Sequence, residues 1–331
     1  MINVYLRRGE AIERLALLPG MMLPLPALWI DLLNPTDHEK ETVEKALELS
    51  LPTREAMQEI ESSSRFYTEG PIYRMTATVL ANADGPNPSA ESLAFIFCLE
   101  GLITVRHSDP RPISSFAARL IKQSASYPTA REVLVGILEA FIDRLADILE
   151  RIGLDLDALS QQIFDTRPTT ERRRIGERRD LQTILKSLGR IEDLTSTIRE
   201  SLLSLTRLIR FITPEYEANA KNNLKELRTR IKSLRSDIIS LNEHSAFESH
   251  KVNFLLDATL GMISIEQNRI IKIFSVAAVI FLPPTLVASV YGMNFHYMPE
   301  LSWVFGYPLA LGLMVLSAIV PFLYFRRMGW L

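Results

Sequence analysis

Two apolar runs near the C-terminus, residues 273–291 and 301–325, constrain this chain more than any other feature of its sequence. Neither run contains an Asp, Glu, Lys or Arg residue, although such residues make up 23% of the chain. Each run falls within the roughly 17–25 residues that a helix needs to cross a bilayer. The sequence therefore predicts two membrane spans, at about residues 270–291 and at residues 305–326, joined by a loop over residues 292–304.

Basic residues flank the two spans on one side only. Arg269 and Lys272 precede the first span, and Arg326 and Arg327 follow the second, at the start of the tail over residues 327–331. Residues 292–300 contain no Lys or Arg. Because positively charged flanks stay in the cytoplasm, we expect both termini inside and the loop outside.

Residues 1–128 are predicted to form a cytosolic α+β domain, a mixed sheet flanked by helices. Helices at residues 36–49 and 53–61 begin at the N-caps Thr36 and Thr53, and Glu39 completes a capping box with Thr36. The single cysteine, Cys98, lies in an apolar run and indicates a buried strand thiol. Short runs rich in β-branched and aromatic residues predict seven strands, at residues 2–6, 15–18, 27–32, 65–68, 73–81, 93–99 and 102–107.

Residues 129–212 are predicted to form antiparallel cytosolic helices, preceded by a shorter helix at residues 114–125. Pro168 separates a helix at residues 129–164 from one that begins at the cap Thr170 and ends near residue 212. Apolar residues recur in both at spacings of three and four, which is typical of helices packed on other helices.

Pro214 is expected to end that helix and to begin the next. Residues 215–291 are then predicted to form one stalk helix of about 75 residues, ~110 Å long, which continues into the first span. A helix of this length cannot bury its own apolar stripe. Identical subunits around a symmetry axis would cover what the preceding helices leave exposed.

Six arginines gather in the turn between the two antiparallel helices. We favour a solvated face, partly paired with Glu171, Glu177 and Asp180, over contact with anionic lipid headgroups. No aromatic residues interleave the arginines, which argues against a nucleic-acid interface. The arginines are Arg167, Arg172, Arg173, Arg174, Arg178 and Arg179.

The sequence lacks the motifs of an enzyme or of an organic cofactor site. Its histidines show no metalloprotease spacing, and neither a glycine-rich phosphate loop nor a G-x-S-x-G motif is present. His244 and His250, with Glu243 and Glu248, could be considered as metal ligands. A separation of six residues places the two imidazoles on different helix faces, so we expect ordinary stalk surface instead.

The first span carries a stripe of residues that changes character along its length. Its cytosolic part is bulky and apolar, and its outer part is small and hydroxylic. This gradient suits a pore with a hydrophobic constriction, although packing against lipid and neighbouring helices would also produce a stripe. Pro283 and Pro284 are expected to bend or loosen the helix. The stripe consists of Ile271, Phe274, Ala278, Leu282, Thr285 and Ser289.

The loop after the first span begins with YGMNFHYMPEL, residues 291–301. Gly292 lets the backbone turn, and the carbonyls at a helix C-terminus favour cations. Asn294 adds an amide oxygen, and Glu300, repeated in each subunit, would form an acidic ring. Mg²⁺ gives up its waters reluctantly, so neutral oxygen acceptors of this kind suit the hydrated ion.

This stretch, followed by Trp303, GYP and a closing RRMGWL, resembles the CorA family of divalent-cation transporters. The position of the GMN triplet at the outer end of the penultimate span makes the resemblance specific. It implies a funnel-shaped homopentamer in the bacterial inner membrane that mediates Mg²⁺ influx. It also implies a selectivity filter of Gly292, Met293 and Asn294 and a mouth loop that contains His296, Met298, Pro299 and Glu300.

The resemblance further implies a pore lining and a regulatory ion. Ile271, Phe274 and Leu282 would be hydrophobic constrictions, and cytosolic Mg²⁺ between subunits would hold the pore shut. Asp237 and Asp257 are candidate ligands of that ion by residue type only, and a solvated stalk face is favoured for them. The implied lining is Asn268, Ile271, Phe274, Leu282 and Thr285, and the stripe adds Ala278 and Ser289.

Three features depart from the family's usual pattern. Phe274 and Leu282 occupy constriction positions often held by Leu and Met. His296 stands where an acidic residue is common, which weakens the attraction of cations, more so when a histidine is protonated below about pH 6.5. The tail has only two basic residues where some relatives have a longer run. These departures concern rate and ion preference.

Two other functions stay open at this point. One is transport of Zn²⁺, Co²⁺ or Ni²⁺, as in the zinc-transporting branch of the same superfamily, although the intact GMN triplet and Glu300 favour Mg²⁺. The other is a membrane-anchored scaffold whose hairpin only tethers. Such an anchor has no need for a polar turn or for a stripe graded from apolar to hydroxylic.

Overall fold

The computed structural model describes the chain apart from residues 86, 99–100, 165–179, 219–224, 295, 297, 299–302 and 331. It contains two compact units, Met1–Leu255 and Leu256–Leu331. The predicted arginine-rich turn lies outside the described residues, as do Pro168, Thr170, Pro299 and Glu300.

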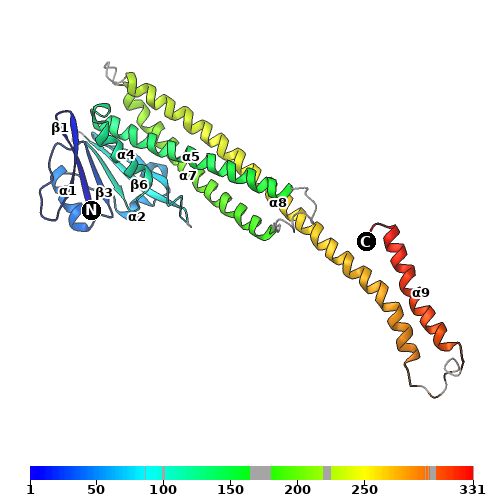
Figure 1. Cartoon of the computed structure of the whole chain (residues 1–331). Coiled ribbons are helices and arrows are strands. Elements are labelled where there is room, and N and C mark those ends of the chain that lie inside the picture. The colour runs from blue at the N-terminus through cyan, green and yellow to red at the C-terminus, as the bar shows by residue number, and fades with distance from the viewer. Residues whose placement is uncertain are drawn as a thin grey trace. The chain divides into compact units, whose positions relative to one another are not determined.

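A seven-stranded mixed sheet lies at one end of the first unit (Figure 1). Its strand order is β2-β1-β3-β7-β6-β5-β4. β3 and β7 pair in parallel, and the other neighbours pair antiparallel. A parallel pair requires a long crossover, which residues 34–100 provide. The seven predicted strands are confirmed, with shifted bounds: β1 (Ile2–Arg8), β2 (Ala11–Leu17), β3 (Trp29–Leu33), β4 (Phe66–Glu69), β5 (Ile72–Ala81), β6 (Ser89–Cys98) and β7 (Gly101–Arg106).

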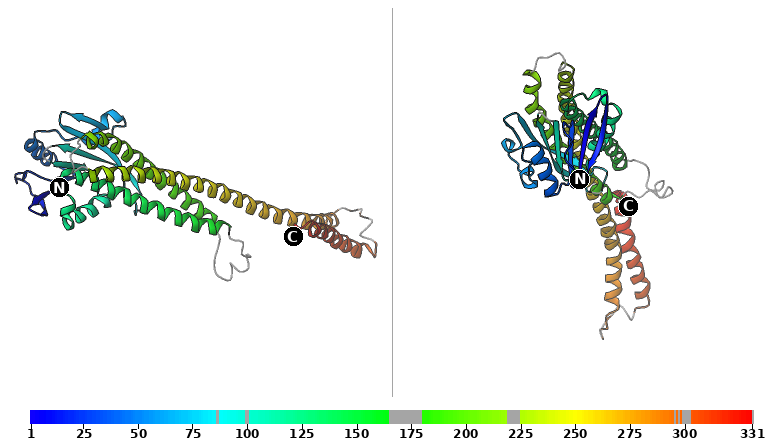
Figure 2. Two further views of the ribbon diagram at one scale, coloured as in Figure 1. Left: turned by 90° about the horizontal axis from the view of Figure 1, so that it is seen from above. Right: turned by 90° about the vertical axis from the view of Figure 1, so that its left-hand side faces the viewer.

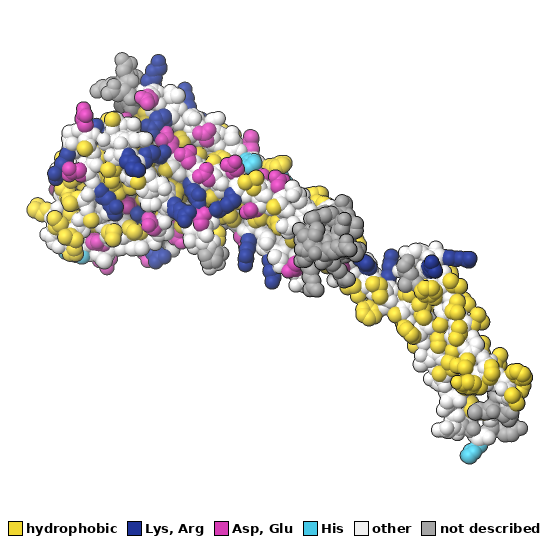
Figure 3. Space-filling model, in the orientation of Figure 1, with side chains coloured by type: hydrophobic (Ala, Val, Ile, Leu, Met, Phe, Trp, Pro, Cys, Tyr) yellow, Lys and Arg dark blue, Asp and Glu magenta, His cyan; other side chains and the backbone are white. Residues whose placement is uncertain are grey.

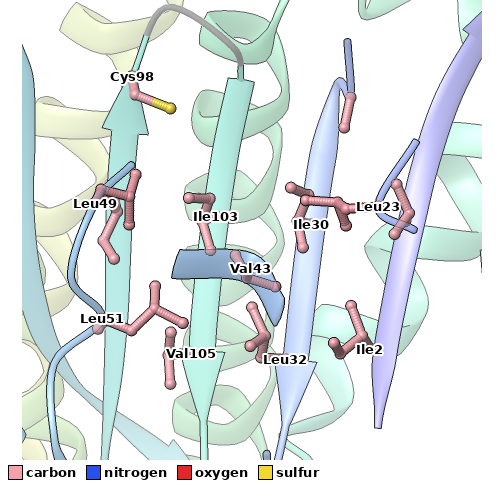
Figure 4. Close-up of a cluster of buried hydrophobic side chains, with 14 of the residues drawn as sticks. Ile2, Leu23, Ile30, Leu32, Val43, Leu49, Leu51, Cys98, Ile103 and Val105 are labelled. Carbon is pink, nitrogen blue, oxygen red and sulfur yellow. The ribbon is translucent and has the colours of Figure 1, made fainter. Parts of the chain in front are cut away.

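One face of the sheet packs against α1 (Asp37–Leu47) through a hydrophobic core (Figure 4). Val43 of α1 is completely buried, and Cys98 is buried at the end of β6, as predicted. The expected capping box holds the start of α1. The Glu39 amide donates to Thr36 Oγ1 at 3.3 Å, and the Thr36 amide donates to Glu39 Oε2 at 2.9 Å. The strands contribute Ile2, Ile30, Leu32, Ile103 and Val105 to this core.

The opposite face of the sheet carries a buried polar network near α4 (Arg111–Lys122). The Trp29 indole N–H donates to Thr104 Oγ1 at 2.9 Å, and that hydroxyl donates to Asp31 Oδ1 at 2.8 Å. Arg106 Nη2 lies 2.9 Å from Asp31 Oδ2. The Trp29 ring meets Phe116 of α4 edge-on. Because both charges are paired and hydrogen-bonded, neither is left uncompensated in the core.

Three helices of the first unit lie side by side: α5 (Ala130–Phe164), α7 (Leu181–Ala218) and the first part of α8 (Lys225–Tyr291) (Figures 1 and 2). Their contacts fix the directions, since α5 and α8 run the same way and α7 runs against both, as predicted. The contacts are Glu139 with Arg230 at 2.7 Å, Asp157 with Lys251 at 2.8 Å, Glu192 with Ser249 at 2.9 Å, and Glu215 with Arg131 at 2.9 Å.

Pro214 lies inside α7 and does not end it, so the expected stop near residue 212 is wrong. The described part of α8 has 67 residues, and residues 219–224, which precede it, lie outside the described part of the chain. The missing backbone donor is tolerated because the last turn of α7 is held by packing. Tyr216 is buried there, and the Tyr73 hydroxyl of β5 donates to Glu215 Oε2 at 2.6 Å.

The helix expected at residues 53–61 is also wrong in extent, because α2 (Arg54–Met57) ends after one turn. Thr53 caps it as predicted, accepting from the Ala56 amide at 3.2 Å. Beyond Met57 nothing supports a longer helix, since Ile60 is 87% exposed. A second short helix, α3 (Ser62–Arg65), follows. α4 begins three residues earlier than expected, with Pro112 in its first turn.

The second unit is a hairpin of the C-terminal part of α8 and α9 (Gly306–Arg327). Both helices are long and apolar enough to cross a membrane, and they end close to the predicted spans. Apolar side chains cover the outside of the hairpin, and Lys and Arg side chains gather at one end (Figure 3). This is the surface expected of a membrane hairpin.

Candidate cation pore

The predicted ion site begins where α8 ends. The Gly292 amide donates to the Ala288 carbonyl at 2.9 Å, and the Met293 amide donates to the Val290 carbonyl at 3.4 Å. A Cβ at residue 292 would lie 3.1 Å from the Ala288 oxygen, closer than an ordinary contact. The φ of Gly292 is not left-handed, so the backbone conformation itself does not require glycine. What requires it is the close approach of residue 292 to the Ala288 carbonyl. A side chain here would push on the last turn of α8.

The side chains that follow this turn are open to solvent in the single chain. Met293, Asn294 and His296 are exposed, and Met298 is partly buried. The Asn294 amide oxygen and the carbonyls at the end of α8 are neutral acceptors, as a hydrated divalent cation requires. The predicted filter residues thus stand together at one end of the hairpin, available to an ion.

One face of α8 packs against α9 in the hairpin. Val276 is 3% exposed, and the partly buried positions that follow it recur at helical spacing. On α9, Gly306 and Ala310 are buried. Pro283 and Pro284 belong to this packed side, and α8 stays helical through both. The bend or loosening expected at these prolines stays a prediction. The partly buried positions of α8 are Ala277, Ile280, Pro283, Pro284, Val287 and Tyr291.

The predicted pore stripe lies on the opposite face of α8. At 100° per residue, its six members stand about 160–240° around the helix from Val276. All six are exposed in the single chain, and so is Asn268. Phe274 is 72% exposed and Leu282 is 65% exposed, which is costly for apolar side chains unless lipid or other subunits cover them. The Thr285 hydroxyl donates to the Phe281 carbonyl at 2.7 Å, so its oxygen still offers lone pairs outward.

The candidate regulatory ligands are not gathered into a site within one chain. Asp237 and Asp257 are both exposed on α8, and Ser233 Oγ lies 3.4 Å from Asp237 Oδ2. They are separated by about five and a half helical turns, so the two side chains of one chain cannot bind one ion together. Among the described residues, no group of three or more His, Cys, Asp and Glu side chains could hold a metal.

Glu248 differs from the expected stalk surface. Its side chain is 4% exposed, and its Oε1 lies 3.6 Å from His244 Nε2. Its Oε2 has no hydrogen-bond partner in the described part of the chain. A Cβ on Gly153 of α5 would lie 3.2 Å from Glu248 Oε1, so this glycine makes room for the carboxylate. His250 is exposed and belongs to the surface, as predicted.

These features define a class: a membrane protein with two spans, a polar loop between them, and a large α+β unit ahead of a long helix. The model of one family, described as CorA-like Mg²⁺ transporter protein, matches residues 27–327. The chain belongs to this family. The predicted resemblance, fold class and membrane location are thereby confirmed.

Relatives match over the whole length. The magnesium transport protein CorA of Pasteurella multocida is 39% identical over 305 residues, which is 92% of each chain. The protein of the same name from Escherichia coli K12 is 35% identical over 331 residues, 100% of both chains. Among solved structures, the CorA magnesium transporter of Methanocaldococcus jannaschii superposes with a TM-score of 0.73 at 18% identity, covering 100% of this chain and 99% of that one. That likeness shows the fold.

Proposed function

We propose that the chain forms a homopentameric channel for Mg²⁺ influx across the inner membrane, with the stripe face of α8 lining the pore. The observation that carries the proposal is the division of α8 into two faces. One packs on α9, and the other presents the stripe and leads to Gly292, Met293 and Asn294. The names of the full-length relatives support Mg²⁺ as the ion.

The pore proposal explains the gradient along the stripe. Ile271, Phe274 and Leu282 would form apolar rings in which water is unstable, so small movements of the helices would close the path. Thr285 and Ser289 would hold water near the filter. Cations would be drawn inward by the membrane potential, at about 2.3 kcal/mol per charge per 100 mV.

Asn294→Ala tests the filter. We expect it to abolish Mg²⁺ uptake in a host that lacks its own Mg²⁺ transport, because the amide oxygen that holds the hydrated ion is gone. Val315→Ala is the control, since Val315 is exposed on α9, away from the stripe. Both variants should elute as the same oligomer. Wild-type uptake by Asn294→Ala would overturn the filter assignment.

The transported ion is tested by competition. Zn²⁺, Co²⁺ and Ni²⁺ are each measured against Mg²⁺ on one flux signal in reconstituted vesicles. We expect Mg²⁺ to be carried best, because the filter offers neutral oxygens rather than the imidazole or thiolate that the softer ions prefer. Absence of flux for every ion would favour the scaffold instead.

A further inference from the structure

Residues 328–330 fold back onto the hairpin. After α9, Gly329 adopts a left-handed φ of +70°, and the Trp330 amide donates to the Phe325 carbonyl at 3.1 Å. This is a helix C-cap that glycine favours. The turn stacks the Trp330 ring on Phe325, with centroids 5.4 Å apart. Lys272 of α8 places Nζ 5.5 Å from the centroid of the Trp330 ring.

Four basic residues lie in the helix ends next to this aromatic turn, and one of them, Lys272, contacts it. Arg269 and Lys272 come from α8, Arg326 and Arg327 from the end of α9, and Lys and Arg gather at this end of the apolar hairpin (Figure 3). Within the described chain, none of the four forms an ion pair with a carboxylate. α9 contains no acidic residue, and the nearest one on α8 is Glu266. The cluster therefore has an excess of positive charge.

The geometry points to a ligand that is both anionic and amphiphilic. The cation–π contact holds the Lys272 ammonium beside the Trp330 ring, and the N–H donors that point away from the ring can meet an oxygen acceptor. The basic cluster adjoins the lipid-covered apolar surface, and Trp330 is 39% exposed beside it. A tryptophan with one apolar side and one polar edge suits the headgroup level of a bilayer.

We propose that Arg269, Lys272, Arg326, Arg327 and Trp330 form a binding site for the phosphate of an anionic phospholipid in the cytoplasmic leaflet. The basic side chains hold the phosphate, and the indole packs against the upper part of the acyl chains. The proposal depends on the hairpin crossing the membrane and not on which ion is transported. It gives the short tail a role in anchoring the cytoplasmic end of both spans.

Tryptophan quenching by brominated lipids tests the site in the full-length protein. Trp303→Phe leaves Trp330 as the indole beside the lipid, because Trp29 is buried in the first unit and adds only a constant background. The protein is reconstituted in phosphatidylcholine vesicles that contain a minor fraction of either brominated phosphatidylglycerol or brominated phosphatidylcholine. We expect phosphatidylglycerol to bind near Trp330 more strongly than phosphatidylcholine does, by roughly fivefold for each basic residue that contacts the lipid phosphate.

Charge variants, made in the same Trp303→Phe background, distinguish a specific lipid site from a general attraction between the protein's positive charge and anionic lipid. Lys272→Gln, and Arg326→Gln with Arg327→Gln, should each lower the lipid preference about fivefold or more. Lys272→Arg should retain the lipid preference. Arg199→Gln on α7 is the matched control, because it removes one positive charge outside the cluster and should leave the preference unchanged. If Lys272→Gln fails to assemble, the arginine variants decide alone. Equal quenching by the two lipids, or an unchanged preference in the charge variants, would overturn the site.

A final arm distinguishes a lipid phosphate from a free one. Inorganic phosphate is added at an ionic strength matched with sodium chloride, and the phosphatidylglycerol preference is measured again. We expect the two salts to have the same effect, because the free anion lacks acyl chains to pack against Trp330. Loss of the preference in phosphate alone would overturn the lipid assignment.

Discussion

Ser201 and Ser204 are one helical turn apart on α7, and both are buried, but they differ in their hydrogen bonding. Ser204 Oγ accepts from the Thr78 amide of β5 at 2.8 Å. Ser201 Oγ has no partner among the residues that the structure describes. β4 pairs with β5 only as far as Met75, so the amide of Thr78 depends on the helix rather than on a strand. We therefore expect the two hydroxyls to contribute differently to stability.

Ser204→Ala is expected to lower the free energy of unfolding by about 1–3 kcal/mol, because it leaves a buried amide without an acceptor. Ser201→Ala is the matched control and should be neutral or slightly stabilising, since it removes an unpaired hydroxyl. Thermal unfolding of the purified full-length variants measures both. Equal destabilisation by the two substitutions would contradict this account.

Asp84 is a second residue on which several elements depend. It lies between β5 and β6 and accepts from Arg111 at 2.5 Å, Arg144 at 2.5 Å and Arg151 at 2.8 Å. The hydrogen bond from Arg151, followed by that from Arg144 and by the charges of Arg144 and Arg111, lowers the pKa of the carboxyl below its ordinary 3.8. One carboxylate thereby joins the loop to the start of α4 and to α5.

Asp84→Asn should cost about 1–2 kcal/mol near neutral pH, a value reduced because the side chain is 26% exposed. A lowered pKa contributes stability above the unfolded value and loses it as the pH falls through the folded value. The difference between wild type and variant should therefore stay constant down to about pH 5 and shrink only below pH 3.8. Unfolding midpoints across this range measure it. A difference that disappears already at pH 5 would exclude Asp84 as the cause.

The assignment of two faces to α8 predicts which introduced cysteines a water-soluble reagent can reach. Thr285→Cys should react with a water-soluble maleimide, because a thiol in a water-filled pore can ionise. Val276→Cys should stay unlabelled against α9, and Val315→Cys should stay unlabelled in lipid. Cys98 adds little background because it is buried. Labelling of Val315→Cys as fast as that of Thr285→Cys would contradict the assignment of faces.

Element types were predictable from the sequence, and several element ends were not. Strand patterning and the Thr36 capping box act locally, so a single sequence reveals them. The continuation of α7 past Pro214 could not be predicted in this way, because it depends on contacts of Glu215 and Tyr216 with residues far away in the sequence. Glu248 was missed for a similar reason: it occupies the buried face of α8, where Phe247 would be expected, and Phe247 is 61% exposed. Only the neighbouring helices determine which face is inside.

For the whole molecule, we infer that cytosolic Mg²⁺ bound between subunits stabilises the closed pentamer, with Asp237 and Asp257 as candidate ligands. By mass action, the bound ion would stabilise the closed state by about 2.7 kcal/mol when its concentration is one hundred times the dissociation constant. Limited proteolysis of the purified protein should therefore slow markedly when Mg²⁺ is added, and Asp237→Asn or Asp257→Asn should reduce the protection. Identical cleavage with and without Mg²⁺ would contradict the proposal.

The candidate site was predictable in outline for a chemical reason. Uncharged spans, a loop without Lys or Arg, and the GMN triplet are properties of the sequence itself, so the hairpin and the position of a candidate filter could be predicted from them. The face of α8 that packs on α9 could not be read in the same way, because both faces of a membrane helix are apolar. The contact of Trp330 with Lys272 joins residues far apart in sequence and required the fold-back turn at Gly329.

The position of the sheet early in the chain affects how the protein is made. In the described part of the chain every strand lies before residue 107, and the parallel β3–β7 pair joins the two halves of the sheet once β7 has been synthesised. Domains generally fold as units, the N-terminal one first, while the ribosome is still at work. The first unit can therefore fold in the cytoplasm before the apolar spans emerge. The insertion machinery then receives a nascent chain whose soluble part is already folded, so that only the short outer loop has to cross the bilayer.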